Sequence, residues 1–259
     1  MNIENHKPGS FCWLELGTTD QNAAKKFYGA LFGWTPEDTP MGPGETYTTF
    51  QLNGRKAAAG YTLMKDMVEK GIPPHWMLYI AVKEADAAAK RVAELGGKVM
   101  AEPFDVFEFG RMAVIQDPTG GTISVWQPKN HKGTEVAQEP GTLCWADLNT
   151  PQPEIAAKFY ADWLGWKFET GKDGYRHILN GDLKSDMIGG IPPEFHAPPG
   201  TPPHWLPYIA AADCKATAEK AASLGAHAIM PAALIDGVGT IAVLADPQGA
   251  VFALYQPLA

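Results

Sequence analysis

The residues best suited to chemistry occur twice in this chain, once in each half. Glu15 lies in the segment FCWLEL, and Asp147 holds the corresponding place in LCWADL, 132 residues later. His75 and His204 each follow Pro-Pro, in segments that are 129 residues apart. A carboxylate and an imidazole can exchange protons or bind a metal ion. Each half therefore carries one candidate pair of chemically active side chains.

The spacing of these pairs follows from a duplication of the chain. The stretch from Pro8 to Trp34 recurs without a gap from Pro140 to Trp166, and Asp-Pro-Thr-Gly at 117–120 recurs as Asp-Pro-Gln-Gly. Repeats of 20–50 residues indicate solenoids or propellers, whereas this much longer period indicates a duplicated domain. The expected units are a first domain, a polar linker and a second domain, at 8–128, 129–139 and 140–257.

Composition disfavours several classes of function. The net charge is −8 and no basic run occurs, which argues against a nucleic-acid or anionic-membrane partner. No apolar run approaches the roughly 20 residues that span a bilayer, and the first residues lack the apolar segment of a signal peptide. Three cysteines cannot form a disulfide framework and fit a reduced, cytoplasmic protein.

The elements that must position the candidate side chains follow from local patterns. Alternation over 11–16 predicts a strand with Phe11, Trp13 and Glu15 on one face and Cys12 on the other. Asp20 is the expected N-cap of a helix that ends at Phe32. Strands follow at 46–52 and 57–63, and the order is then repeated by a strand at 75–82, a helix at 84–95 and strands at 98–101, 110–116 and 122–127. The second half shows the same order, interrupted by a proline-rich loop at 192–203.

This arrangement resembles the vicinal oxygen chelate superfamily, which includes glyoxalase I, bleomycin-resistance proteins and extradiol dioxygenases. The residues that carry the resemblance are Lys26-Phe27-Tyr28, Phe32-Gly33-Trp34, Leu95-Gly96-Gly97 and Trp126-Gln127-Pro128, with their mates in the second half. The tandem form with His-Trp-x-x-Tyr is similar to bacterial glyoxalase-like proteins. The resemblance implies an α+β fold of two tandem domains, each made of two βαβββ modules that form a half-barrel cleft around a small ligand.

Enzymes of this superfamily hold a divalent metal with His, Gln or Glu side chains at fixed strand positions. By the resemblance, these positions fall at Phe11, Met77 and Ser124, and at Leu143, Leu206 and Ala253. The usual ligand set is thus missing from both halves, so we expect no metal and no other cofactor. The remaining route to a divalent metal would use Glu15, His75, Asp147 and His204, which offers two ligands per half where a catalytic site usually has three.

The favoured hypothesis is therefore a protein that binds a small aromatic or polar organic molecule. The expected contacts are Phe11, Trp13, Glu15, His75, Met77, Tyr79, Arg111 and Ser124 in the first half, and Trp145, Asp147, His204 and Tyr208 in the second. The alternatives are a glyoxalase-type lyase or isomerase, or a dioxygenase, with an altered ligand set, and a scaffold protein whose clefts are vestigial. No catalytic residue is assigned.

Each candidate also has a structural interpretation. For the two histidines at strand entries, a hydrogen bond to a loop carbonyl is slightly favoured over contact with a ligand. A carboxylate on a concave face is costly to bury without a partner. We therefore expect Glu15 and Asp147 either to form a salt bridge, with Arg111 in the case of Glu15, or to act as an acid or base. Cys12 and Cys144 are expected to be buried and unreactive.

Overall fold

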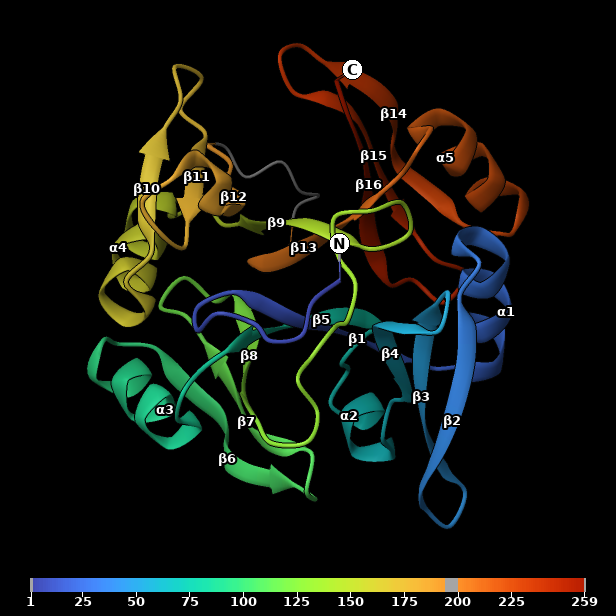
Figure 1. Ribbon diagram of the computed structural model, residues 1–259, viewed down its shortest axis with the longest axis horizontal. Coiled ribbons are helices and arrows are strands. Elements are labelled where there is room, and N and C mark those ends of the chain that lie inside the picture. The colour runs from blue at the N-terminus through green and yellow to red at the C-terminus, as the bar shows by residue number, and fades with distance from the viewer. Residues whose placement is uncertain (1, 194–199, 259) are drawn as a thin grey trace.

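The computed structural model describes residues 2–193 and 200–258, which form two eight-stranded sheets (Figure 1). The first sheet has the order β2-β3-β4-β1-β5-β8-β7-β6, and the second has the order β10-β11-β12-β9-β13-β16-β15-β14. The two orders are identical when each half is numbered from its own first strand. The predicted α+β class with two tandem copies is therefore confirmed.

In the first half, the bounds of the predicted elements lie within two residues of the predicted ranges, except that the strand expected at 98–101 extends to Val106. The first half contains β1 (Phe11–Thr18), α1 (Gln21–Phe32), β2 (Thr35–Gly42), β3 (Glu45–Leu52), β4 (Arg55–Thr62), α2 (Lys65–Glu69), β5 (His75–Ala81), α3 (Ala85–Glu94), β6 (Lys98–Val106), β7 (Gly110–Gln116) and β8 (Thr122–Pro128). The second half contains β9 (Leu143–Asn149), α4 (Pro153–Leu164), β10 (Lys167–Thr170), β11 (Arg176–Leu179), the 3₁₀ turn at Lys184–Asp186, β12 (Met187–Ile191), β13 (His204–Ala210), α5 (Cys214–Ser223), β14 (His227–Ile235), β15 (Gly239–Ala245) and β16 (Val251–Pro257). Among the described residues, no helix has the length and apolar character needed to cross a membrane.

Three elements escaped the sequence patterns. Strand β2 is exposed at every residue and contains Pro36 and Pro40, so it shows no alternation of buried and exposed positions. Proline is tolerated there because β2 is an edge strand whose only partner is β3. The short strand β10 is the corresponding edge in the second half, and α2 is a five-residue helix with no buried side chain. Half of the proline-rich loop predicted at 192–203 lies outside the described residues, since 194–199 are not described.

The two modules of each half join through their first strands. β1 runs antiparallel to β5, and β9 runs antiparallel to β13. The two modules of each half therefore belong to one sheet. In the first half this register places Trp13 opposite Tyr79, and Tyr79 opposite Ser124 of β8, so three strands present these side chains in one row.

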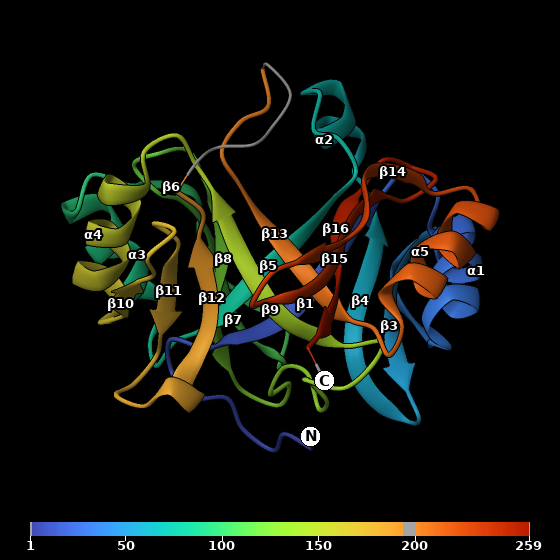
Figure 2. The ribbon, with the colours of Figure 1, turned by 90° about the horizontal axis from the view of Figure 1, so that it is seen from above.

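The two sheets share a single hydrophobic core that contains residues from both halves. Leu14 and Leu16 of β1 belong to the same buried cluster as Ala146 and Leu148 of β9. Figures 1 and 2 show α1 beside α5 at one flank of the molecule and α3 beside α4 at the other. The halves are thus packed through one face of each sheet, and the opposite face, which we call the outer face, turns away from this core.

Reciprocal hydrogen bonds fasten the halves together. The hydroxyl of Tyr28 donates to Asp246 over 2.9 Å, and the hydroxyl of Tyr160 donates to Asp117 over 3.0 Å. Trp34 and Trp166 repeat the exchange, because each indole nitrogen donates over 2.8 Å to a backbone carbonyl of the other half. The tyrosines of α1 and α4 thus form polar contacts between the repeats.

The segment expected to be a linker packs along the first sheet. Its Val136 is fully buried, and the backbone nitrogen of Thr134 donates to the carbonyl of Cys12 over 2.8 Å. The backbone nitrogen of Glu135 donates to the carbonyl of Lys56 at the same distance. These bonds hold the connection against β1 and β4.

Candidate functional site

A bulge in β1 determines which side chains reach the outer face. In the pairing with β5, Phe11 lies opposite Ile80 and Trp13 lies opposite Tyr79, so Cys12 is an extra residue. An extra residue reverses the alternation of faces. Trp13 and Glu15 consequently point to the outer face, whereas Phe11 points into the shared core.

The outer face of the first sheet carries a separate apolar cluster. Its buried members are Cys12, Trp13, Ala59, Tyr79, Ala81 and Trp126, and its half-buried members are Tyr47, Met77, Val106 and Met112. The cluster draws on β1, β3, β4, β5, β6, β7 and β8, so every strand of this sheet except the edge strand β2 contributes to it. Four of its members are Trp or Tyr, whose rings combine apolar faces with a polar tip.

Glu15 stands on this face and is bonded by two phenols. The hydroxyls of Tyr47 and Tyr79 each donate to one carboxylate oxygen over 2.7 Å. The indole nitrogen of Trp13 donates in turn to the hydroxyl of Tyr47 over 3.0 Å. Burial raises the pKa of Glu15, and the two phenol hydrogen bonds oppose this effect because they stabilise the anion. Glu15 is recessed among its neighbours, yet part of its surface remains accessible.

The second half repeats this arrangement around Asp147. The hydroxyls of Tyr175 and Tyr208 donate to its two oxygens over 2.6 and 2.8 Å, and the indole of Trp145 donates over 3.0 Å. Asp147 is only 5% exposed, and burial raises its pKa to about 6. The ring of His177 lies edge-to-face against that of Tyr175, with centroids 4.8 Å apart, and its charge acts to lower the pKa of Asp147.

The two adjacent glycines of β12 lie where other groups approach the strand closely. A methyl group placed on Gly190 would lie 1.9 Å from the hydroxyl oxygen of Tyr175. A methyl group placed on Gly189 would lie 2.3 Å from the carbonyl oxygen of Ala146. Gly190 lies opposite Asp147 in the ladder between β12 and β9, so the glycine makes room for Tyr175 to reach the carboxylate.

Ser124 completes the row across the first sheet. Its side chain is fully buried, and its hydroxyl oxygen has no hydrogen-bond partner within the described part of the chain. Its neighbours Ile123 and Val125 belong to other core clusters, whereas Trp126 belongs to the outer-face cluster, so Ser124 also turns to the outer face. Ala253 stands at this place in the second half, opposite Tyr208. An unpaired buried hydroxyl is costly, which marks this position as different in the two halves.

Phe11 and Arg111 were predicted to contact the ligand, but they do not lie on the outer face, so both predictions are wrong. Phe11 packs against Trp166 and Trp205, with ring centroids 5.8 and 5.4 Å apart, because of the bulge. Arg111 alternates with Met112, so it points to the face covered by α3, where it forms two hydrogen bonds of 2.6 and 2.8 Å to Asp86. Arg111 is therefore not the partner of Glu15.

The two predicted histidines lie at the ends of their strands. His75 bonds through Nδ1 to the carbonyl of Pro73 over 2.8 Å, and His204 bonds in the same way to Pro202 over 3.0 Å. The structural interpretation of these histidines is thus confirmed. His75 also lies close to Gly17 and to the hydroxyl of Tyr61, since a methyl group on Gly17 would meet both at 3.1–3.2 Å.

Several residues of the outer face were not predicted. Tyr47 and Tyr175 lie in or beside predicted strands, but their orientation depends on strand pairing. His131 belongs to the connecting segment, and its ring lies 4.4 Å from the ring of Trp13 and 5.9 Å from that of Trp126. Burial lowers the pKa of His131 to about 4, so this ring is neutral near pH 7. No periodic pattern identified it, because the segment forms neither a strand nor a helix.

The donors present on the outer faces do not fit the divalent metal of the superfamily. Among residues 2–193 and 200–258, no group of three or more His, Cys, Asp or Glu side chains is placed to hold a metal ion. The positions in the row across β1, β5 and β8 are Trp13, Tyr79 and Ser124, which supply no strong metal ligand.

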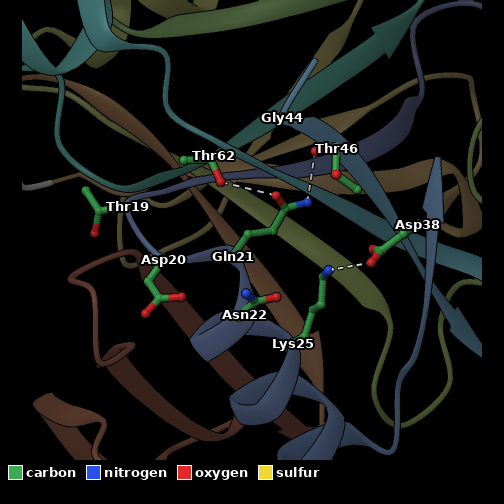
Figure 3. A pocket seen from close by; sticks show the side chains of 9 residues that line it. All are labelled: Thr19, Asp20, Gln21, Asn22, Lys25, Asp38, Gly44, Thr46 and Thr62. Carbon is green, nitrogen blue, oxygen red and sulfur yellow. Dashed lines mark hydrogen bonds and ion pairs between the residues drawn. The ribbon is translucent and has the colours of Figure 1, made fainter. Parts of the chain in front are cut away.

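Two shallow depressions lie away from the outer-face clusters. One, of about 350 Å³, lies at the start of α1, where Lys25 pairs with Asp38 over 2.6 Å and Gln21 bonds Thr46 and Thr62 (Figure 3). The other, of about 400 Å³, lies between the halves beside Trp163. Lys25, Asp38 and Gln21 in the first depression are thus already bonded within the protein.

Comparison with known proteins agrees with this architecture. A family described as "Glyoxalase/Bleomycin resistance protein/Dioxygenase superfamily" matches residues 10–125, and one described as "Glyoxalase-like domain" matches residues 145–255. "Putative glyoxylase CFP32" of Mycobacterium tuberculosis is 41% identical over 97% of this chain and 96% of its own length. "Anthracycline biosynthesis protein DnrV" of Streptomyces peucetius is 34% identical over 96% of this chain and 94% of its own length.

Solved structures share the fold at much lower identity. The Mn(II)-bound glyoxalase from Novosphingobium aromaticivorans superposes with a TM-score of 0.66 at 17% identity, over 96% of this chain and 82% of that chain. The 2,3-dioxygenase LapB from Pseudomonas sp. KL28 superposes with a TM-score of 0.61 at 12% identity, over 96% of this chain and 94% of that chain. With two matching family regions and relatives above 30% identity along nearly its whole length, the chain belongs to the glyoxalase/bleomycin resistance protein/dioxygenase superfamily, as two tandem copies of its domain.

Proposed function

We propose that this protein binds a small, flat aromatic molecule on the outer face of its first sheet, without a divalent metal. The observation that carries the proposal is the hydroxyl of Ser124, which is fully buried and unpaired among the described residues while it faces an aromatic cluster. A ligand oxygen or nitrogen would supply the missing hydrogen bond. Ligand sites are typically apolar surfaces with a few such polar groups.

The side chains around Ser124 suit a flat ligand. The rings of Trp13 and Trp126 are buried, and a flat ligand would reach them by displacing the half-buried Met77 and Met112, whose side chains are flexible. Tyr61 lies beside Tyr47 in the ladder between β3 and β4, and the charge of Glu15 acts on its pKa, so its hydroxyl lies near the carboxylate. The face thus combines apolar surface with a carboxylate and hydroxyl groups.

The curated relatives support the same class of ligand. Two of them, from Streptomyces sp. (strain C5) and Streptomyces peucetius, are named for anthracycline biosynthesis and are 33% and 34% identical to this chain. An anthracycline is a flat, fused-ring aromatic compound that carries hydroxyl and carbonyl oxygens. Such a molecule has the shape and the hydrogen-bonding groups that the outer face would accommodate.

The test is a titration with a hydroxylated anthraquinone, followed by calorimetry and by quenching of tryptophan fluorescence. We expect saturable binding that is unchanged by a chelator. Ser124→Ala should weaken binding by up to about tenfold, since one hydrogen bond is lost. The matched control is Thr217→Ala on the exposed surface of α5, which should leave the affinity unchanged. Binding that requires added metal, or that is insensitive to Ser124→Ala, would overturn the proposal.

A glyoxalase-type reaction is the second candidate, favoured by the name of the mycobacterial relative. It requires turnover of a 2-oxoaldehyde–thiol adduct, and the measurement is the rate of its consumption with each of Zn²⁺, Ni²⁺ and Mn²⁺. Metal-dependent turnover would replace the binding proposal. Absence of both turnover and ligand binding would instead favour a scaffold role.

A further inference from the structure

Among the residues that the structure describes, the carboxylate of Glu15 is bonded by phenols and by no cation. Throughout residues 2–193 and 200–258, the ion pairs involve other carboxylates, and none includes Glu15 or Asp147. A recessed anion without a counter-ion is unfavourable, because it loses hydration and gains no compensating charge. The same arrangement occurs in both halves, so it is a property of the repeat.

The two carboxylates differ in what surrounds them. Asp147 accepts three hydrogen bonds, lies near His177 and is almost wholly buried. Glu15 accepts two hydrogen bonds, remains partly accessible and has no imidazole that acts on its pKa. An ionised carboxylate offers about four acceptor positions, so Glu15 keeps about two for another molecule.

Aromatic side chains surround the acceptor positions of Glu15 that remain free. Trp13 and Tyr79 lie opposite each other in the ladder, Tyr47 contacts Glu15 directly, and Tyr61 is paired with Tyr47 across β3 and β4. The faces of Trp and Tyr attract cations through their quadrupoles, most strongly when the cation is desolvated. A carboxylate beside such rings favours an organic ammonium group over a neutral or anionic one.

We propose that the outer face of the first sheet recognises a protonated amine on its ligand, held between Glu15 and the rings of Trp13, Tyr47 and Tyr61. This inference rests on the proposed binding of a flat aromatic molecule and specifies which members of that class are selected. The amine supplies the positive charge that Glu15 lacks, and the aromatic body of the ligand lies toward Met77 and Ser124.

The experiment compares two matched probes, an anthraquinone that carries an aminoalkyl chain and its N-acetylated derivative, which is neutral. Each is titrated calorimetrically at pH 7.5 into the full-length protein, into Glu15→Gln and into Glu69→Gln. Glu69→Gln removes the same charge from the exposed helix α2. We expect the wild-type protein and Glu69→Gln to bind the amine about tenfold more tightly than the neutral probe. Glu15→Gln should lose this preference while it retains its affinity for the neutral probe.

The possible outcomes separate the two proposals. Equal affinity of the wild-type protein for both probes would overturn the amine inference and leave the binding function intact. A preference that survives in Glu15→Gln would show that another group recognises the amine, which also overturns the inference. No binding of either probe would overturn the proposed function itself. If Glu15→Gln fails to fold, equal affinity of the wild-type protein for the two probes still overturns the inference. Glu15→Asp, which withdraws the carboxylate from the rings, then takes the place of Glu15→Gln: its preference for the amine should fall, and an unchanged preference would overturn the inference.

Discussion

Replacement of Asp147 by asparagine should stabilise the protein above pH 6. Asparagine has the same shape, and its amide can both accept a hydrogen bond from Tyr208 and donate one to the hydroxyl oxygen of Tyr175. The change removes the charge, which is unfavourable in this buried position, together with one acceptor oxygen. The indole of Trp145, which donates to that oxygen, keeps the hydroxyl of Tyr175 as an acceptor over 2.8 Å. Burial raises the pKa of Asp147 from its ordinary value of 3.8 to about 6.

The magnitude and sign of this effect follow from proton linkage. Below pH 3.8 the carboxyl group is neutral in both the folded and the unfolded protein, so it imposes no penalty. Between pH 3.8 and about 6 the unfolded protein loses its proton first, and the free energy of unfolding falls as the pH rises. The difference between these two pKa values corresponds to a loss of about 3 kcal/mol in the free energy of unfolding, and this loss is complete above pH 6.

The measurement is the free energy of unfolding in urea at about pH 4 and pH 8 for the wild-type protein and Asp147→Asn. The difference between the two proteins should move in favour of the variant by about 2–3 kcal/mol across this range. Asp162→Asn is the control, because Asp162 is exposed and pairs only with Lys158; it should change stability by less than about 0.5 kcal/mol at both pH values. The reasoning would be refuted if Asp147→Asn were less stable than the wild-type protein by the same amount at both pH values.

Three further predictions concern packing and burial. Tyr28→Phe should lower the free energy of unfolding by about 1–3 kcal/mol, because Asp246 and the indole of Trp76 each lose a buried partner. The control is Tyr255→Phe, measured in the same urea titration. The hydroxyl of Tyr255 bonds an exposed carbonyl, so its removal should lower the free energy of unfolding by much less. Gly190→Ala should destabilise the protein by about 1–3 kcal/mol and displace Tyr175, and an unchanged Tyr175 ring in a structure of the variant would contradict this. The three buried cysteines should react with a thiol reagent only after unfolding, since burial raises the pKa of Cys12, Cys144 and Cys214; rapid labelling of the native protein would refute it.

Local patterns were sufficient to predict most of the fold. The internal repeat, the order of elements and the N-cap at Asp20 all follow from short-range signals, and Asp20 does accept a hydrogen bond from the backbone of Ala23 over 2.9 Å. Alternation also placed Trp13 and Glu15 correctly on the face away from Leu14. These features depend on neighbours within a few residues, and such neighbours are visible in a sequence.

The tertiary structure decided how the site is completed. A single extra residue at Cys12 turned Phe11 into the shared core, and alternation alone cannot reveal a bulge. One of the two phenols that bond Glu15 comes from Tyr47, 32 residues away. The ring against Trp13 comes from His131 in the connecting segment. The sequence by itself determined that each half presents a carboxylate on one strand face. Only the pairing of distant strands determined that Glu15 has the rings of Trp13, Tyr47 and Tyr79 around it and, among the described residues, no ion pair, because these contacts join strands that are far apart in the sequence.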